Sequence, residues 1–126
     1  MIAHASINVS NYKKGMDFYT SVLTPLGYTQ NMDYAEAAGF NDGKNTDFWI
    51  AKVDSPTPGH IAFETKSAAE VEAFYEAALV AGAKDNGKPG YRTEYWPGYY
   101  AAFVLDADGN NIEAVWFDYS KVEKDR

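Results

Sequence analysis

The sequence of 126 residues contains no cysteine, which excludes disulfides, thiolate zinc sites and cysteine nucleophiles. It also lacks a signal peptide and any apolar run long enough to cross a bilayer, so we expect a cytoplasmic protein that does not enter a membrane. Basic residues are few, because 11 Lys and Arg stand against 18 Asp and Glu. The formal net charge of −7 argues against nucleic acid and anionic membrane surfaces as partners, since both need clustered Lys and Arg.

What is present indicates a folded protein. Hydrophobic residues make up 46% of the chain and aromatic residues 16%, well outside the range of disordered sequences. A chain of this length is enough for one domain with an ordinary core. We therefore treat residues 1–126 as a single domain.

Histidine occurs only twice, and each occurrence opens the same local pattern. A Phe-Tyr pair follows His4 at residues 18–19 and follows His60 at residues 74–75, the same distance along the chain. A glycine comes soon after each pair. This internal duplication predicts that the two imidazoles lie together in space, and a metal site is the first hypothesis. The alternative is that both are structural histidines bonded to neighbouring backbone.

Each half of the sequence predicts a strand, a helix and about three further strands. Residues 2–9 alternate, with His4 on the more polar face, and residues 60–65 repeat the alternation with His60. Ser10 and the capping box of residues 67–70 predict the two helix starts. Hairpin turns are predicted near residues 41–43 and 107–109. The first module spans about residues 1–54 and the second about 60–118, with a Pro-rich linker between them.

Three shorter stretches complete this organisation. Residues 85–90 predict a turn-rich loop, and the polar tail from Asp118 onward predicts an exposed end. Glu113 lies in a strand that otherwise reads as buried, so its carboxylate needs a partner. Asp47 holds the corresponding place at the end of the first module.

Taken together, these motifs resemble the vicinal oxygen chelate superfamily, which includes glyoxalases, bleomycin-resistance proteins and extradiol dioxygenases. The resemblance rests on His4-Ala-Ser-Ile-Asn-Val, on Leu26-Gly27-Tyr28, on His60-Ile-Ala-Phe, and on the run from Phe103 to Glu113. That last run, with the turn Asp-Ala-Asp-Gly, is similar to the family's turn before a metal-binding glutamate, with Ala107 in place of the usual proline. The resemblance covers nearly the whole chain.

The resemblance implies an α+β fold in which paired βαβββ modules form an incomplete barrel around a cleft. It also implies one divalent metal ion held by His4, His60 and Glu113. Two imidazoles and a carboxylate suit Fe, Mn, Zn or Ni. The family's fourth ligand falls near Asp47 and Trp49, where the aspartate is short and the indole cannot ligate. A three-ligand site resembles the dioxygenase and fosfomycin-resistance branches of the superfamily more closely than glyoxalase I.

An aromatic and charged stretch, residues 92–100, just before a predicted core strand supplies candidate substrate contacts. Arg92 is a candidate clamp for an anionic group, and Tyr95 and Tyr100 are candidate walls of the pocket, together with Trp49. Tyr99 is a candidate acid or hydrogen-bond donor, and Glu113 a candidate base. The alternative is a sheet face packed with tyrosines and a tryptophan that only packs.

The expected function is a metalloenzyme of the glyoxalase/dioxygenase type, with the metal as a Lewis acid on a small oxygen-bearing metabolite or antibiotic. A lyase, a dioxygenase and a thiol transferase all fit the resemblance. The alternative is a metal-free, bleomycin-resistance-like protein that binds a small molecule, and a vestigial site is a third possibility. The family also implies a homodimer with sites near the interface.

Overall fold

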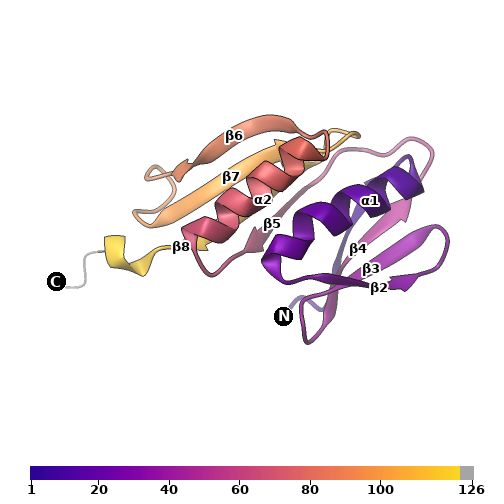
Figure 1. Cartoon of the computed structure of the whole chain (residues 1–126), viewed down its shortest axis with the longest axis horizontal. Helices are drawn as coiled ribbons and strands as arrows, with labels where there is room; N and C mark the ends of the chain where they lie inside the picture. Colours follow the sequence, from indigo (N-terminus) through magenta and orange to yellow (C-terminus); the bar gives the residue numbers. More distant parts are fainter. Residues whose placement is uncertain (123–126) are drawn as a thin grey trace.

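The computed structural model describes residues 1–122, and the same series of elements occurs in it twice (Figure 1). The first module consists of β1 (Ala5–Val9), α1 (Tyr12–Leu23), a 3-10 turn (Thr24–Leu26), β2 (Thr29–Asp33), β3 (Ala37–Asn41) and β4 (Thr46–Lys52). The second consists of β5 (His60–Glu64), α2 (Ala68–Val80), β6 (Lys84–Tyr91), β7 (Tyr99–Leu105), β8 (Asn111–Phe117) and a 3-10 turn (Tyr119–Lys121). The predicted α+β fold of paired βαβββ modules is confirmed, and the sheets do not close into a barrel.

Each module builds its own four-stranded sheet. The strand orders are β1-β4-β3-β2 and β5-β8-β7-β6, with the first strand of each module parallel to the last and the other pairs antiparallel. Helix α2 packs on one face of the second sheet, and α1 lies beside α2 (Figure 1). We call the face of the second sheet that is turned away from α2 the open face. Of the alternate β7 residues on this face, Tyr99, Phe103 and Leu105 are half-buried and Ala101 is buried.

One hydrophobic core joins the two modules. Inner-face residues of both sheets and buried residues of both helices belong to a single cluster. Phe48 of β4 contacts Phe63 of β5 with ring centroids 5.0 Å apart, and Tyr28 meets the same Phe63 ring edge-on at 5.5 Å. The modules therefore share a core instead of each closing its own.

The helix starts follow the predicted chemistry with one change. Ser67 caps α2, and its hydroxyl accepts a hydrogen bond of 3.2 Å from the Glu70 amide. At α1 the cap is Asn11 and not Ser10, because the Asn11 side chain accepts from the Lys14 amide at 3.0 Å. Within residues 1–122, neither α1 nor α2 has the length and apolar character needed to cross a membrane.

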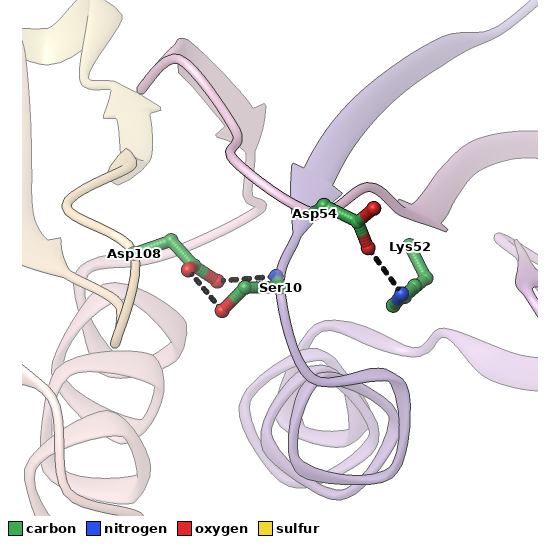
Figure 2. A network of polar contacts seen from close by, with 4 residues as sticks. All are labelled: Ser10, Lys52, Asp54 and Asp108. Atoms are coloured by element: carbon green, nitrogen blue, oxygen red, sulfur yellow. Dashed lines mark hydrogen bonds and ion pairs between the residues drawn. The ribbon is translucent and has the colours of Figure 1, made fainter.

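Ser10 instead joins the two modules. Its amide and its hydroxyl donate to the Asp108 carboxylate at 3.0 and 2.6 Å (Figure 2). The figure also shows the Lys52–Asp54 pair, an ion pair of 2.7 Å at the end of β4 where the linker begins. Ser10 directly follows β1 of one module and Asp108 lies in the last turn of the other, so this contact fixes their relative position.

A buried polar network lies next to this contact. The Asp106 carboxylate accepts four hydrogen bonds, from the Tyr19 hydroxyl at 2.5 Å, the Asn110 side chain at 2.8 Å and the amides of Asn110 and Asp108 at 2.9 and 3.0 Å. Asn110 is fully buried, donates to the Asn8 carbonyl and accepts from the Gly59 amide. Through these two side chains, the last turn of the second module holds β1, α1 and the linker.

Two expectations for the second module were wrong. Residues 85–90 are not a loop, because β6 runs through them in an irregular pairing with β7 that accommodates Gly87 and Pro89. Asp118 is not exposed, because it is buried and accepts from the Tyr91 hydroxyl at 2.6 Å. The exposed end begins at Tyr119, and residues 123–126 of the predicted tail lie outside the described residues.

Candidate functional site

The structure brings His60 and Glu113 into direct contact. His60 begins β5 and Glu113 lies on the parallel neighbour β8, opposite Ala62. The His60 Nε2 atom is 3.2 Å from Glu113 Oε1. The side chain of Glu113 is 3% exposed and that of His60 is 49% exposed. The predicted need of Glu113 for a partner is therefore met by one of the two histidines, at a place that a ligand can reach.

The other ring nitrogen of His60 sets the chemistry of this pair. His60 Nδ1 lies 2.8 Å from the Asn111 carbonyl oxygen, which can only accept, so Nδ1 carries a hydrogen and donates. In the neutral ring, Nε2 then presents a lone pair toward Glu113 Oε1, which is also an acceptor. Two facing acceptors need a cation between them, either a shared proton or a metal ion. A histidine oriented by a backbone carbonyl is the usual arrangement of metal-binding imidazoles.

Tyr99, at the start of β7, is the hydrogen-bond partner of the second carboxylate oxygen of Glu113. Its hydroxyl donates to Glu113 Oε2, which leaves Oε1 for the His60 side. Burial raises the pKa of the Tyr99 hydroxyl, and the hydrogen bond to Glu113 and the charge of that carboxylate raise it further. Tyr99 therefore keeps its proton and acts as a fixed donor to Glu113 at neutral pH.

Aromatic rings surround Tyr99 at this end of the open face. Tyr95 and Phe117 meet Tyr99 edge-on at centroid distances of 5.2 and 5.6 Å. Trp96 contacts Phe117 at 5.9 Å and Tyr119 at 5.2 Å, also edge-on. Tyr95 is 62% exposed and Tyr119 is 66% exposed, so the cluster presents rings to solvent beside the His60–Glu113 pair.

The third predicted metal ligand is not brought to this pair. Strand β1 begins at Ala5, so His4 lies just outside it and not within a strand over residues 2–9, and its side chain is exposed. Among residues 1–122, no three His, Asp or Glu side chains are placed to hold one metal ion. A single copy of the chain thus supplies two of the three predicted ligands in one place.

The other predicted contacts divide between the two faces of the sheets. Tyr100 lies on the α2 side, where its hydroxyl donates to Glu72 at 2.6 Å, so the structure does not bring it to His60 and Glu113. Burial, with the Glu72 bond and charge, raises the Tyr100 pKa to about 12. Trp49 lies in the first sheet and stacks on Tyr34 at 6.0 Å. Tyr95 lies beside Tyr99, as described above.

Arg92 lies on the open face. Its guanidinium donates to the carbonyls of Gly90 and Lys88 at 2.9 and 2.7 Å and sits 5.4 Å from the centre of the Phe103 ring. Phe103 is directly opposite Glu113 in the β7–β8 pair. Sequence spacing did not predict the Phe103 contact, because it depends on which residues of β6 and β8 flank β7.

A polar cavity of about 360 Å³ was not predicted from the sequence. It is lined by Tyr28, Asp42 and Asp47 of the first module and by residues 61–64 of β5. Asp47 Oδ1 is buried, and the described residues give it no hydrogen-bond partner. Burial raises the pKa of Asp47; the Tyr28 hydroxyl opposes this shift and the Asp42 charge adds to it. The match of Asp47 to Glu113 in the repeat was the available signal for this site.

Asp47→Asn is expected to stabilise the protein at pH 7 by up to about 1 kcal/mol. A carboxyl whose pKa is raised on folding opposes folding once the pH exceeds its unfolded value near 3.8, and the amide removes that charge. The gain should disappear as the pH falls below that value. Urea unfolding at pH 7 and pH 3 measures it, with Asp17→Asn as an exposed control, and equal stability at pH 7 would contradict the burial of a charged Asp47.

Comparison with known proteins agrees with the fold. The family model described as Glyoxalase/Bleomycin resistance protein/Dioxygenase superfamily matches residues 1–114. A glyoxalase/bleomycin resistance protein from Albidiferax ferrireducens T118 has a similar structure, with a TM-score of 0.79 and 22% identity over 90% of this chain and 96% of that one. Lactoylglutathione lyase from Agrobacterium tumefaciens is similar at a TM-score of 0.69 and 14% identity, over 92% of each chain. No curated protein matches the sequence significantly.

Proposed function

Because the chain belongs to the glyoxalase/bleomycin resistance protein/dioxygenase superfamily, we propose that it is a metal-dependent enzyme acting on a small oxygen-bearing molecule. The observation that carries the proposal is the pair of facing acceptors, His60 Nε2 and Glu113 Oε1, 3.2 Å apart. A divalent ion of the Fe, Mn, Zn or Ni type satisfies both atoms, because imidazole and carboxylate are ligands that these metals accept.

The residues present fit such an ion in part. His60 and Glu113 converge, while His4 lies apart from them within one copy. We propose that a second copy in a homodimer supplies His4, so that each site takes its ligands from two chains. The position of His4 supports this, because it is exposed and comes directly before β1, an edge strand of the first sheet.

The side chains around Glu113 indicate how it would work. When bound, the metal supplies a Lewis acid that polarises a substrate oxygen. The Tyr99 hydroxyl holds Glu113 Oε2 by a hydrogen bond and keeps that oxygen from turning toward the substrate. Glu113 Oε1 would hold the metal and, when released from it, would take a proton from a bound molecule, while the Asn111 carbonyl keeps the His60 ring in place. The buried setting of Glu113 limits access of bulk water to this oxygen.

One observation favours a second candidate function, a protein that binds a small molecule without metal. Tyr95 and Tyr119 expose their rings beside Trp96, and flat aromatic surfaces suit planar ligands. In that case the His60–Glu113 pair shares a proton and serves only to orient the ligand. The two functions differ in metal binding, which makes that measurement the decisive one.

Purified protein reconstituted with Zn²⁺, Mn²⁺, Fe²⁺ or Ni²⁺ is expected to retain close to one equivalent of at least one metal per chain after dialysis. Glu113→Gln should weaken that binding at least about 100-fold. Loss of a group that only supports a metal ligand already lowers metal affinity about 10–100-fold, and loss of a ligand itself should cost more. Titration calorimetry and elemental analysis measure both. The metal-loaded protein is then assayed with methylglyoxal–thiol adducts, catechols and fosfomycin.

Glu64→Gln is the matched control, since Glu64 lies on the same strand as His60 but is exposed. Metal binding should be unchanged in it. Retention of less than about 0.1 metal per chain by the wild type would reject the metalloenzyme and leave the binding protein.

A further inference from the structure

A single row of residues crosses the open face from one edge of the second sheet to the other. Gly87 of β6 is paired with Phe103 of β7, Phe103 with Glu113 of β8, and Glu113 with Ala62 of β5. The row ends in two small residues, Gly87 and Ala62, and a polar side chain that does not belong to the row lies near each end. His60 lies at the Glu113 end, and Arg92 lies at the Gly87 end.

The Arg92 guanidinium occupies space that is open because Gly87 and Gly90 have no side chain. A Cβ at Gly87 would lie 3.0 Å from Arg92 Nη2 and 2.9 Å from the Phe103 ring, and one at Gly90 would lie 3.3 Å from Arg92 Nη1. The two carbonyl bonds and the Phe103 ring below then hold the guanidinium in one orientation. An arginine fixed in advance loses little side-chain entropy when it binds an anion.

The Arg92 charge is not neutralised within the described chain. Among residues 1–122, no carboxylate lies within ion-pair distance of it, although acidic residues outnumber basic ones in the sequence. Its carbonyl bonds use one N–H from each terminal nitrogen, and a guanidinium has five. Three donors therefore remain outside these two bonds, on a guanidinium that lies over Phe103, the residue paired with Glu113.

We propose that Arg92 is an anion-binding subsite of the open face, and that the natural ligand is a small dianion or a carboxylate with a second oxygen group. One oxygen group binds Arg92 and the other binds at the His60–Glu113 pair, with the carbon chain lying over Phe103. This inference rests on the proposed function for the second contact, while the anion contact itself depends only on Arg92.

The row sets the size of the ligand. Gly87 and Glu113 are two strand spacings apart, roughly 10 Å. Contacts of about 3 Å at each end leave roughly 4 Å between the two oxygen groups, the span of a two-carbon spacer. Succinate has this length and charge, and succinamide has the same shape without the charge.

Titration calorimetry of the full-length protein with succinate and succinamide tests the subsite. We expect at least about tenfold tighter binding of succinate, because a charge-assisted, forked contact to Arg92 is made only by the anion. Arg92→Gln should remove the part of this preference that the Arg92 contact supplies, and so lower it clearly below that of the wild type. Arg92→Lys, which keeps the charge without the fork, should retain only part of it. Lys84→Gln, which removes a charge from β6, the strand that ends just before Arg92, should keep the wild-type preference.

Equal binding of the two ligands by the wild type, or an unchanged preference in Arg92→Gln, would overturn the inference. Thermal unfolding of each variant separates loss of binding from loss of folding, and Arg92→Lys serves if Arg92→Gln does not fold. A zinc titration of the same proteins keeps the two proposals apart. An Arg92-dependent preference for succinate without metal binding would reject only the metalloenzyme proposal. Metal binding without that preference would reject only the anion-subsite proposal.

Discussion

His4→Ala and Glu113→Gln proteins are each expected to bind almost no metal, whereas an equilibrated mixture of the two should recover roughly a quarter of the wild-type sites. This follows if each site takes His4 from one copy and His60 with Glu113 from the other. A mixed dimer then has one site that carries both substitutions and one site that carries neither. Random pairing makes about half of the dimers mixed, and half of their sites are intact. Elemental analysis of the mixture after subunit exchange gives the recovered fraction.

A mixture of His60→Ala with Glu113→Gln is the matched control. These two residues are in contact within one copy, so every site of the mixed dimer keeps one substitution and no binding should return. Recovery in the control, or its absence in the first mixture while the wild type binds metal, would show that the ligands are not divided between copies in this way. Sedimentation confirms that both mixtures are dimeric.

Asp106→Ala is expected to destabilise the protein by about 3–5 kcal/mol. The substitution leaves four donors without an acceptor, including the buried Tyr19 hydroxyl and the Asn110 side chain. Asp106→Asn should be almost as damaging, because its amide nitrogen would face a donor. A domain of this size has a total stability of about 5–15 kcal/mol, so the loss should be plain in urea unfolding.

Two other aspartates calibrate that result. Asp108→Ala removes the two bonds to Ser10 and should cost about 1–2 kcal/mol, and Asp17→Ala removes an exposed pair with Lys13 and should cost less than about 0.5 kcal/mol. If Asp106→Ala cost no more than Asp108→Ala, the buried network would not be a principal link between the modules.

The fold was predictable from the sequence because its signals are local and occur twice. Alternation predicted the strand that carries His60, a hairpin turn followed by an apolar run predicted the strand that carries Glu113, and the capping box predicted the start of α2. The expected loop at residues 85–90 was wrong because Gly87 and Pro89 read as turn residues, whereas pairing with β7 holds them in an irregular strand. Ser10 looked like a cap, but a carboxylate 98 positions away binds it, and no local pattern records that contact.

The candidate site was only partly predictable, for a related reason. The need of a buried Glu113 for a partner could be read from its neighbours, and His60 is that partner. Tyr99 and Tyr100 are adjacent in sequence but lie on opposite faces of β7, Tyr99 beside Glu113 and Tyr100 beside α2. The sequence does not say which of the two tyrosines faces which way. The Asp106 network joins residues from the two modules, and its members look like ordinary turn residues in the sequence.

The contact of Phe48 with Phe63 bears on what the duplication means. A module cut out of this chain would keep its strand order but lose one wall of its core, because the rings that fill that space come from the other half. The whole chain should therefore unfold cooperatively, without an intermediate in which one module is folded and the other unfolded. The repeated modules share a pattern but are not independently stable units. The shared core holds them together, so the sequence of the linker between them can vary without separating the modules.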